Sequence, residues 1–399
     1  MHIITITTLF PNATDRQRAV FVENLVKSLK RFTTVSVISP VPFVPPFLRS
    51  ANRTKQRGIP STELIGEIEV THPRFVVLPK LLFVRAFFYC LSVLPQVRRI
   101  VNDRNNCVLH AHFAFPDAVA VGLVSTILGV PFFITAHGSD INVYSKYKLL
   151  LPQIRWALRR AHGVIAVSKE LQRKVTELIG PGKSAVVQIP CAGFDPRLFC
   201  KPPVEIEIVD NALIRSGRVA LFVGRLVPIK GVDVLVDAWG ILRDRGFLVE
   251  NDCLVIIGEG ELRRALEMRA LNANLDGHVR WLGELPHSEI ARQMARATIL
   301  CLGSYNEGTP NVVIEALASG IPVVTTRVGG LPDVVIEGVN GFMVPPGEPA
   351  LLADGIASAF VAKWNKEAIR ESVSHLTWDA IAERNFKFLS GVDRKVEYA

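Results

Sequence analysis

Two glutamates separated by seven residues, Glu307 and Glu315, flank the start of an apolar segment in the C-terminal third of the chain. We expect Thr309 to cap a helix over Asn311–Ser319, with Pro310 at the first helical position, where a missing N–H costs nothing. The unpaired N–H groups of such a first turn attract anions. One carboxylate would lie on each side of a bound phosphate, and both could accept hydrogen bonds from sugar hydroxyls. The pattern predicts a site for a phosphorylated sugar, although the pair alone also fits an ordinary helix with a polar start.

Two cations, Arg225 and Lys230, straddle a glycine turn that follows the apolar run Leu221–Val223 in the same half of the chain. Arginine offers a planar fork of donors and lysine a compact point charge, a combination that suits a pyrophosphate. Alone, the two would be ordinary surface cations. Together with the helix that follows Glu307, they favour a diphosphate site at the carboxyl end of a strand.

Paired carboxylates also serve glycosidases, so hydrolysis is the first alternative to consider. Eight residues of ideal helix would separate Glu307 from Glu315 by roughly 12 Å, whereas glycosidase pairs lie roughly 5 to 9.5 Å apart. The spacing therefore favours a binding clamp over a hydrolytic acid–base pair.

Short β-branched runs alternate with helical patterns throughout, which is typical of parallel sheets with crossover helices. We expect a doubly wound, Rossmann-like α/β domain over residues 1–195, a second over 196–375, and a C-terminal helix, 376–399, that packs back on the first domain. Prolines and glycines between Pro190 and Glu207 mark the boundary. Ligands of such sheets bind at the carboxyl ends of the strands, so a central cleft between the two domains is expected. The predicted strands are Ile3–Thr7, Thr34–Ile38, Cys107–His110, Phe132–Thr135, Gly163–Val167, Ala185–Ile189, Ala220–Val223, Cys253–Ile257, Val279–Leu282, Ile299–Leu302 and Val323–Thr325.

Composition indicates a globular protein with ample core, since 49% of the 399 residues are hydrophobic and 21% are charged. The most apolar stretch, Leu81–Ile100, contains three arginines and a proline, so a transmembrane span is not expected. The N-terminus reads as a buried strand and not as a signal peptide, and the six scattered cysteines fit reduced thiols. These features predict a cytoplasmic protein without a metal cluster.

Charge is divided unevenly between the two halves. Residues 1–190 hold 24 Lys and Arg against 10 Asp and Glu, a balance of +14, whereas residues 191–399 hold 22 against 27, a balance of −5. The basic half could contact an anionic membrane or a phosphate-bearing acceptor, or could simply present a solvated face. The proline-rich loop from Pro40 to Leu48 could likewise enter lipid, grip an acceptor or pack locally.

The ordered set of motifs resembles the retaining glycosyltransferases of family 4, which have the GT-B fold. The resemblance runs through nearly the whole chain, and its motifs are specific as a set although each is weak alone. They are Val223–Leu226 with Lys230–Gly231, Ile257–Gly260, Leu282–Gly283, Ser304–Glu307, Glu307 with Glu315, Val328–Asp333, Gly338–Phe342, Ala136–Asp140, Ile165–Ser168 and Ile189–Asp195.

The resemblance implies a role for each matching residue. Glu307 would hold hydroxyls of the transferred sugar, Glu315 the ribose, and Arg225 with Lys230 the diphosphate. His137 would reach the reacting sugar from the N-terminal domain, so we expect His137, Glu307, Arg225 and Lys230 to be catalytic. The remaining donor-binding positions implied are Gly224, Gly258, Leu282, Gly283, Gly308, Thr309, Pro310, Asn311 and Val312, and the acceptor-binding positions are Arg18, Ala19, His137 and Asp140.

Two departures concern backbone turns. Arg18 and Ala19 stand where the family usually has glycine, and Cys191–Gly193 replaces an Asn-Gly pair. Close approach of a ligand at Ala19 is thus the less certain part of the resemblance.

The reaction implied is metal-independent, retaining transfer from a nucleotide sugar, such as a UDP- or GDP-sugar, with no cofactor and no nucleic acid partner. The acceptor expected is a saccharide, lipid-linked at the inner face of the plasma membrane, in cell-surface polysaccharide synthesis. The alternatives are a nucleotide-sugar epimerase of the same fold and a noncatalytic donor-binding member of a polysaccharide assembly complex.

Overall fold

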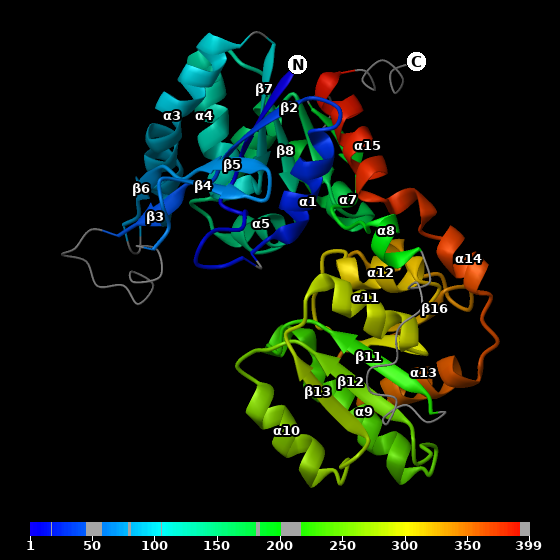
Figure 1. Cartoon of the computed structure of the whole chain (residues 1–399). Coiled ribbons are helices and arrows are strands. Elements are labelled where there is room, and N and C mark those ends of the chain that lie inside the picture. The colour runs from blue at the N-terminus through cyan, green and yellow to red at the C-terminus, as the bar shows by residue number, and fades with distance from the viewer. Residues whose placement is uncertain are drawn as a thin grey trace. The chain divides into compact units, whose positions relative to one another are not determined.

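The computed structural model describes residues 1–16, 18–44, 58–78, 81–104, 106–180, 184–200 and 217–391. The chain forms two compact units (Figure 1), one of Met1–Cys191 with Trp378–Ala399 and the other of Ala192–Thr377. The sequence had placed the same divisions a few residues away, after residues 195 and 375. Residues 201–207 of the predicted boundary segment lie outside the described residues.

Unit 1 is built on an eight-stranded sheet of order β10-β9-β8-β7-β1-β2-β5-β4, in which only the β4–β5 pair is antiparallel. A separate parallel pair joins β3 to β6. The strands are β1 (His2–Ile6), β2 (Thr34–Ile38), β3 (Val41–Phe43), β4 (Thr62–Ile65), β5 (Ile68–Thr71), β6 (Arg74–Val76), β7 (Cys107–His112), β8 (Phe132–Ala136), β9 (Gly163–Ala166) and β10 (Ala185–Gln188).

Helices cover both faces of this sheet. Alternate residues of a strand point to opposite faces, so Ile4 and Ile6 of β1 pack in one apolar cluster with α3 and α4, while Ile3 packs in another with α1 and α15. The helical segments are α1 (Val20–Leu29), η1 (Leu82–Val84), α3 (Arg85–Asp103), η2 (Ala114–Ala118), α4 (Val119–Leu128), α5 (Ser139–Asn142), η3 (Tyr144–Lys146), α6 (Leu151–Arg160), α7 (Lys169–Ile179) and α15 (Trp378–Ser390).

The C-terminal helix α15 belongs to unit 1 although it follows unit 2 in the chain. Ile381 and Leu389 join the cluster that contains Ile3. The ring of Phe388 lies against Gly163 of β9, so closely that a Cβ at Gly163 would lie 2.5 Å from it. This helix therefore completes one face of the unit 1 core.

Unit 2 is built on a six-stranded, wholly parallel sheet of order β13-β12-β11-β14-β15-β16. Its strands are β11 (Val219–Val223), β12 (Cys253–Ile257), β13 (Val279–Gly283), β14 (Ile299–Leu302), β15 (Val323–Thr326) and β16 (Gly341–Val344). Its helical segments are α8 (Pro196–Phe199), η4 (Pro228–Lys230), α9 (Val232–Asp244), α10 (Arg263–Asn272), α11 (His287–Arg296), α12 (Asn311–Ala318), η5 (Leu331–Asp333), α13 (Pro349–Val361), α14 (Lys366–Glu371) and η6 (Ser374–Leu376).

Every predicted strand is present, with ends that differ by at most two residues. The prediction lacked β3, β4, β5, β6 and β16. Both Rossmann-like sheets, and with them the α/β fold class, are confirmed.

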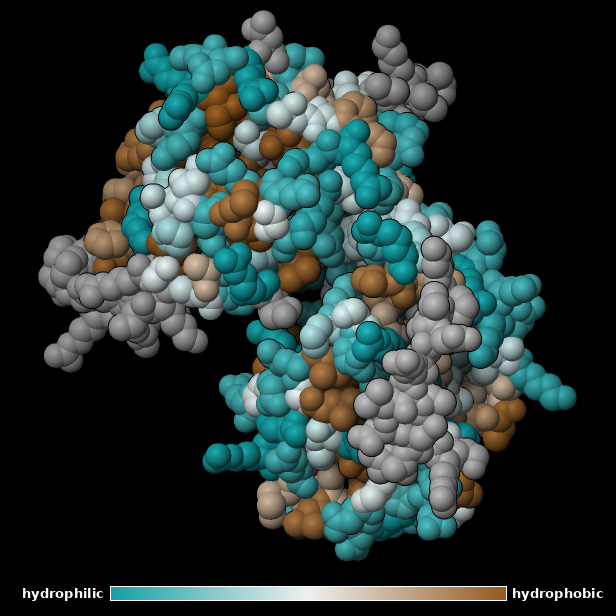
Figure 2. All heavy atoms as spheres, in the orientation of Figure 1, coloured by the Kyte–Doolittle hydropathy of each residue, from teal (hydrophilic) through white to brown (hydrophobic). Residues whose placement is uncertain are grey.

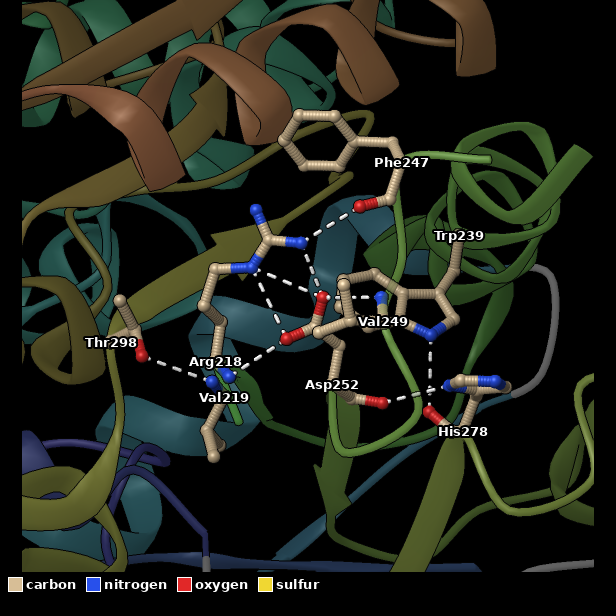
Figure 3. A network of polar contacts seen from close by, with 8 residues as sticks. All are labelled: Arg218, Val219, Trp239, Phe247, Val249, Asp252, His278 and Thr298. Carbon is tan, nitrogen blue, oxygen red and sulfur yellow. Dashed lines mark hydrogen bonds and ion pairs between the residues drawn. The ribbon is translucent and has the colours of Figure 1, made fainter. Parts of the chain in front are cut away.

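A polar network at the amino ends of β11, β12 and β14 fixes the edge of the unit 2 sheet that lies opposite the strand ends expected to bind donor (Figure 3). Arg218 forms an ion pair with the fully buried carboxylate of Asp252, and its guanidinium lies between the rings of Phe247 and Phe360 at 4.5 and 4.7 Å. Thr298 Oγ1 accepts a hydrogen bond from the N–H of Val219 at 3.0 Å. Burial would raise the pKa of Asp252, but its hydrogen bonds, chiefly with Arg218, outweigh that effect and lower the pKa.

Among the described residues no helix is long and apolar enough to cross a membrane. Most of the apolar stretch Leu81–Ile100 lies in α3, which contains Pro95. Residues 45–48 of the proline-rich loop lie outside the described residues.

Candidate active site

Three of the predicted donor-binding glycines meet at the carboxyl ends of neighbouring strands of unit 2. Gly224, after β11, donates its N–H to the carbonyl of Ile257 at 3.0 Å, and Gly258, after β12, donates to the carbonyl of Gly283 at 2.7 Å. Gly258 has φ of 132°, and a Cβ there would lie 2.0 Å from the carbonyl oxygen of Gly224. Only glycine fits at 258. Leu282, beside Gly283, keeps 37% of its surface exposed at this edge.

The strand order of unit 2 reverses at β11, which pairs with β12 on one side and with β14 on the other. Ligands of open α/β sheets bind at such a switch point, outside the carboxyl ends of the strands. The turn after β11 carries Arg225 and Lys230, and the loop after β14 carries Ser304 and Glu307. Tyr305 donates its N–H to the carbonyl of Ile229 at 2.9 Å, which holds the two loops together.

A compact charged cluster lies at this switch point. Lys230 Nζ donates to both carboxylate oxygens of Glu307, at 2.7 and 2.9 Å, and Ser304 Oγ donates to Oε1 of Glu307 at 2.7 Å. The side chains of Lys230 and Glu307 are 24% and 8% exposed. Arg225 is exposed, and its side chain makes no hydrogen bond or ion pair with another described residue. The site thus holds one fixed cation and one that is available to an anion.

The helix after Glu307 begins one residue later than predicted. α12 begins at Asn311, and Pro310, in extended conformation with ψ of 130°, occupies the cap position without a side-chain cap. The predictions that Thr309 caps the helix and that Pro310 is its first residue are therefore wrong. Thr309 is buried instead, with its hydroxyl packed against Gly330. The first N–H groups of α12, including those of Asn311 and Val312, still lack intrahelical acceptors.

A glycine pair after β15 supports the loop that carries Glu307. Gly330 donates its N–H to the carbonyl of Gly308 at 2.8 Å. Gly329 has φ of 56°, and a Cβ there would lie 1.8 Å from the carbonyl oxygen of Glu307. The position of Glu307 therefore depends on the absence of a side chain at 329.

Glu315 has a partner that the sequence reasoning missed. Its side chain is buried, 7% exposed, and accepts a hydrogen bond from His287 Nε2 at 2.8 Å. The hydrogen bond that His287 donates to Glu315 raises the pKa of His287, against the opposing effect of burial. His287 is the first residue of α11, and nothing in its sequence context marks it as a partner of a residue on α12.

In unit 1 the strand order reverses at β1, between β2 and β7. His112, at the end of β7, and His137, just after β8, lie there with Nδ1 of the first 3.1 Å from Nε2 of the second. The rings of His110 and His112 lie 4.3 Å apart. Burial lowers the pKa of all three histidines, that of His110 to about 3. Their imidazoles are therefore neutral, and His112 fixes which ring nitrogen of His137 remains for another partner.

Asp140 is wholly buried and shapes the turn around His137. Its carboxylate accepts hydrogen bonds from the N–H groups of Ala114, His137, Gly138 and Ile141 at 2.8 to 3.1 Å. Burial nevertheless raises its pKa. The oxygens of Asp140 are thus engaged by the backbone of this turn. Its predicted contact with an acceptor stays a prediction.

Asp117, a second buried acid at the same switch point, was not predicted. It accepts hydrogen bonds from the hydroxyl of Thr7 at 3.1 Å and the N–H of Thr8 at 2.9 Å, at the end of β1. Burial raises the pKa of Asp117 to about 7, although these hydrogen bonds act to lower it.

The turn before α1 retains the backbone conformation of a glycine. Ala19 has φ of 47° and ψ of 43°, in the left-handed region that favours glycine. Arg18 is exposed, and its Nε donates to the carbonyl of Thr8 at 3.1 Å. The turn is therefore kept although this chain has alanine at position 19, where the family usually has glycine.

Among the side chains that the structure describes, no group of three or more His, Cys, Asp or Glu is placed to hold a metal ion. The site of unit 2 offers cations and N–H groups to an anion and carboxylates to hydroxyls. A nucleoside diphosphate attached to a sugar presents both kinds of group.

Comparison with known proteins agrees with this chemistry. Residues 18–192 match the family described as Glycosyltransferase Family 4, and residues 205–372 match Glycosyl transferases group 1. The putative teichuronic acid biosynthesis glycosyltransferase TuaC of Bacillus subtilis is 31% identical over 337 residues, which cover 83% of this chain and 82% of that protein.

Solved structures share the fold. Sucrose-phosphate synthase of Thermosynechococcus elongatus superposes with a TM-score of 0.74 at 21% identity, over 99% of this chain and 100% of that one. HepE of Anabaena, in complex with UDP, gives a TM-score of 0.70 at 22% identity, over 98% and 100% of the two chains. With its two Rossmann-like units and its relatedness along most of its length, the chain belongs to the family 4 glycosyltransferases of the GT-B fold.

Proposed function

We propose that this glycosyltransferase moves a hexosyl group, with retention of anomeric configuration, from a UDP- or GDP-type sugar to a hydroxyl of a saccharide acceptor, and that it needs no metal ion or other cofactor. The observation that carries the proposal is the cluster of Lys230, Glu307 and Ser304 at the switch point of unit 2, beside the start of α12. A cation, a carboxylate and open backbone N–H groups at one strand edge match a sugar diphosphate.

In this reaction the bond between the sugar C1 and the β-phosphate oxygen breaks, and a bond forms between C1 and the acceptor oxygen on the same face of the ring. The acceptor's proton passes to an oxygen of the departing diphosphate. Negative charge develops on that diphosphate, and Lys230, Arg225 and the N–H groups of Asn311 and Val312 stabilise it. The chain's contribution is thus electrostatic, with donors fixed before the reaction begins.

The carboxylates orient the donor. Glu307, held by Lys230 and Ser304, accepts hydrogen bonds from the hydroxyls of the transferred sugar. Glu315 accepts from the ribose hydroxyls, which requires that His287 share its carboxylate or move away. His137 contacts the reacting sugar as a neutral imidazole.

We further propose a lipid-linked saccharide as acceptor, at the cytoplasmic face of the membrane, within cell-surface polysaccharide synthesis. Support comes from the basic N-terminal half and from the name of TuaC, which places that relative in teichuronic acid biosynthesis. A nucleotide-sugar epimerase would share the donor site but would act without an acceptor.

In the test, the purified protein is incubated with a panel of nucleotide sugars in the presence of EDTA, in parallel reactions with and without membrane-extracted acceptor. We expect one donor to be consumed only with acceptor, and NMR of the product to give the anomeric configuration of the donor. Isomerisation of the donor without acceptor, inversion, or abolition by EDTA would each refute the corresponding part of the proposal. Transfer that is unchanged by Glu307→Ala would refute the role of Glu307.

A further inference from the structure

An apolar stripe runs along the outer face of η1 and α3 in unit 1. Phe83, Phe87 and Leu91 follow one another at intervals of four residues and therefore lie on one face of the helix. They are 42%, 55% and 50% exposed, and Leu81, just before them, is 42% exposed. A helix on the surface of a globular protein normally carries polar side chains on this side.

A second exposed segment lies beside the stripe. Tyr147 and Leu149, in the loop between η3 and α6, are 50% and 67% exposed. The side-chain amide of Gln153 donates to the carbonyls of both Leu149, at 3.2 Å, and Phe83, at 3.0 Å, and so holds the loop against the start of the stripe. Figure 2 shows hydrophobic residues gathered over α3. We call Leu81, Phe83, Phe87, Leu91, Tyr147 and Leu149 the apolar face.

Exposed cations border the apolar face. Lys146 and Lys148 alternate with its loop residues, and Arg98 and Arg99, seven and eight positions after Leu91, continue the stripe at the end of α3. Between residues 81 and 160 the chain holds nine Lys and Arg but only three acids. Two of these acids, Asp117 and Asp140, are wholly buried. The charged side chains of this segment that are not buried are therefore almost all positive.

We infer that the apolar face docks on an anionic lipid bilayer, with Phe83, Phe87, Leu91 and Leu149 entering the headgroup boundary and Lys146, Lys148, Arg98 and Arg99 contacting lipid phosphates. Apolar side chains bordered by cations, with a tyrosine between them, are the composition of an interfacial membrane surface. This inference rests on the proposed lipid-linked acceptor. Docking would hold unit 1 at the membrane in which that acceptor is anchored.

The test is flotation of the full-length protein with vesicles of phosphatidylcholine alone or mixed with phosphatidylglycerol. We expect binding to the mixed vesicles, and weaker binding when the salt is raised from about 0.1 M to about 0.5 M, because salt screens the lysines and arginines. Phe87→Ser with Leu91→Ser should weaken binding at least about tenfold, since two apolar side chains no longer enter the bilayer. Lys146→Ser with Lys148→Ser should weaken it about fivefold per lysine.

Matched controls come from unit 2. Met268 and Leu271 on α10 are 55% and 48% exposed, so Met268→Ser with Leu271→Ser removes similar exposed apolar surface elsewhere and should leave flotation unchanged. Lys363→Ser with Lys366→Ser serves the same purpose for charge. Equal loss in these controls, or flotation that the α3 and loop variants do not change, would overturn the inference.

Two further outcomes would also overturn it. Wild-type protein that ignores the mixed vesicles does not dock on anionic lipid. Analytical ultracentrifugation gives the second outcome. If the wild-type protein self-associates and the Phe87 and Leu91 variant does not, the apolar face is an interface between copies of the chain.

Consumption of the nucleotide sugar with a detergent-dispersed acceptor separates this inference from the proposed function. The docking variants should keep that activity, because their residues belong to unit 1 and none of them is among the residues assigned to the donor or the acceptor, whereas Lys230 and Glu307 belong to unit 2. Loss of vesicle binding with retained transfer supports docking. Flotation without any transfer would retain the docking surface and refute the proposed reaction.

Discussion

Lys230→Met is the substitution that tests the donor site most directly. It keeps a long apolar side chain and removes only the ammonium group, which donates to Glu307 at 2.7 and 2.9 Å. Two effects with different origins are expected. The diphosphate loses a cation as its charge develops, and Glu307 loses its ion-pair partner even when no donor is bound.

The two effects have different sizes. Removal of one preorganised donor to a developing oxyanion typically lowers kcat about 10²- to 10³-fold, or about 3 to 4 kcal/mol. Breaking a fully buried ion pair costs about 3 to 5 kcal/mol of folding stability. Here Lys230 is 24% exposed and Ser304 continues to donate to Glu307, so we expect a smaller loss of about 2 kcal/mol.

A double-mutant cycle with Glu307→Gln separates the effects. The uncharged amide no longer requires a cation, so the double variant should recover about 1 to 2 kcal/mol relative to Lys230→Met in urea unfolding. It should recover none of the activity, because the diphosphate still lacks its cation. The reasoning is refuted if the double variant is no more stable than Lys230→Met, or if Lys230→Met transfers sugar at the wild-type rate.

Three smaller predictions follow from the same structure. Gly329→Ala would place a methyl group 1.8 Å from the carbonyl oxygen of Glu307, so donor affinity measured by calorimetry should fall about tenfold or more. Gly338→Ala, where φ is 72° but the space is open, should keep the affinity and lose about 1 kcal/mol of stability. Arg218→Met should cost about 2 to 3 kcal/mol in urea unfolding, because Arg218 is 27% exposed and the N–H groups of residues 218 and 249 continue to donate to Asp252; loss of the exposed pair of Arg245 with Asp354 should cost about 0.5 kcal/mol or less. The carboxyl partner of Arg218 has a lowered pKa, so that stabilisation should be present above about pH 3.9 and lost as the pH falls towards the pKa of the folded state; an equal loss at acid and neutral pH would contradict it. His110 should titrate near pH 3 by NMR, so its burial disfavours folding increasingly below about pH 6.5; titration near 6.5 would contradict its burial.

The sequence predicted which residues form the candidate donor site, because that site is built from strand ends. An apolar run that stops at Gly224, Gly258 or Gly283 identifies a strand and its carboxyl end, and parallel pairing brings such ends to one edge. Neighbouring elements in the chain then supply the chemistry. Two adjacent loops of one sheet carry Lys230 and Glu307, so local patterns predicted that both lie at one strand edge, but they did not predict the ion pair between them.

The sequence did not predict contacts between residues on different elements that depend on how those elements pack. His287 and Glu315 lie on different helices, and their meeting depends on how α11 and α12 pack. His112 lay beyond the predicted strand Cys107–His110 and was given no role, because its ring contact with His137 arises only when β7 and β8 pair. The strand β4 at the sheet edge and its neighbour β5 were not predicted, because each carries a glutamate among its apolar residues.

The cap of α12 was mispredicted for a local reason. Thr309 precedes proline, and Pro310 adopts an extended conformation that places it outside the helix. The buried Thr309 then packs against Gly330, a contact that no pattern within one helix could indicate.

The two switch points differ in the charge that their side chains carry. In unit 2 the strand edge carries an ion pair and the exposed Arg225. In unit 1 burial keeps His110 and His112 neutral and raises the pKa of Asp117 to about 7. A neutral edge suits an acceptor hydroxyl, whereas a charged edge suits a diphosphate.

The balance of +14 in residues 1–190 counts only Lys, Arg, Asp and Glu. The switch point of unit 1 contributes two of the acids, Asp117 and Asp140, so these residues do not produce the positive excess. It resides on exposed side chains, among them the lysines and arginines around the apolar face. Charge in an active site would serve the reaction, but charge on an outer surface beside exposed phenylalanines serves contact with something anionic and apolar. This separation of the neutral edge from the basic surface is the physical reason to expect unit 1 to bind the acceptor's saccharide at one place and the membrane at another.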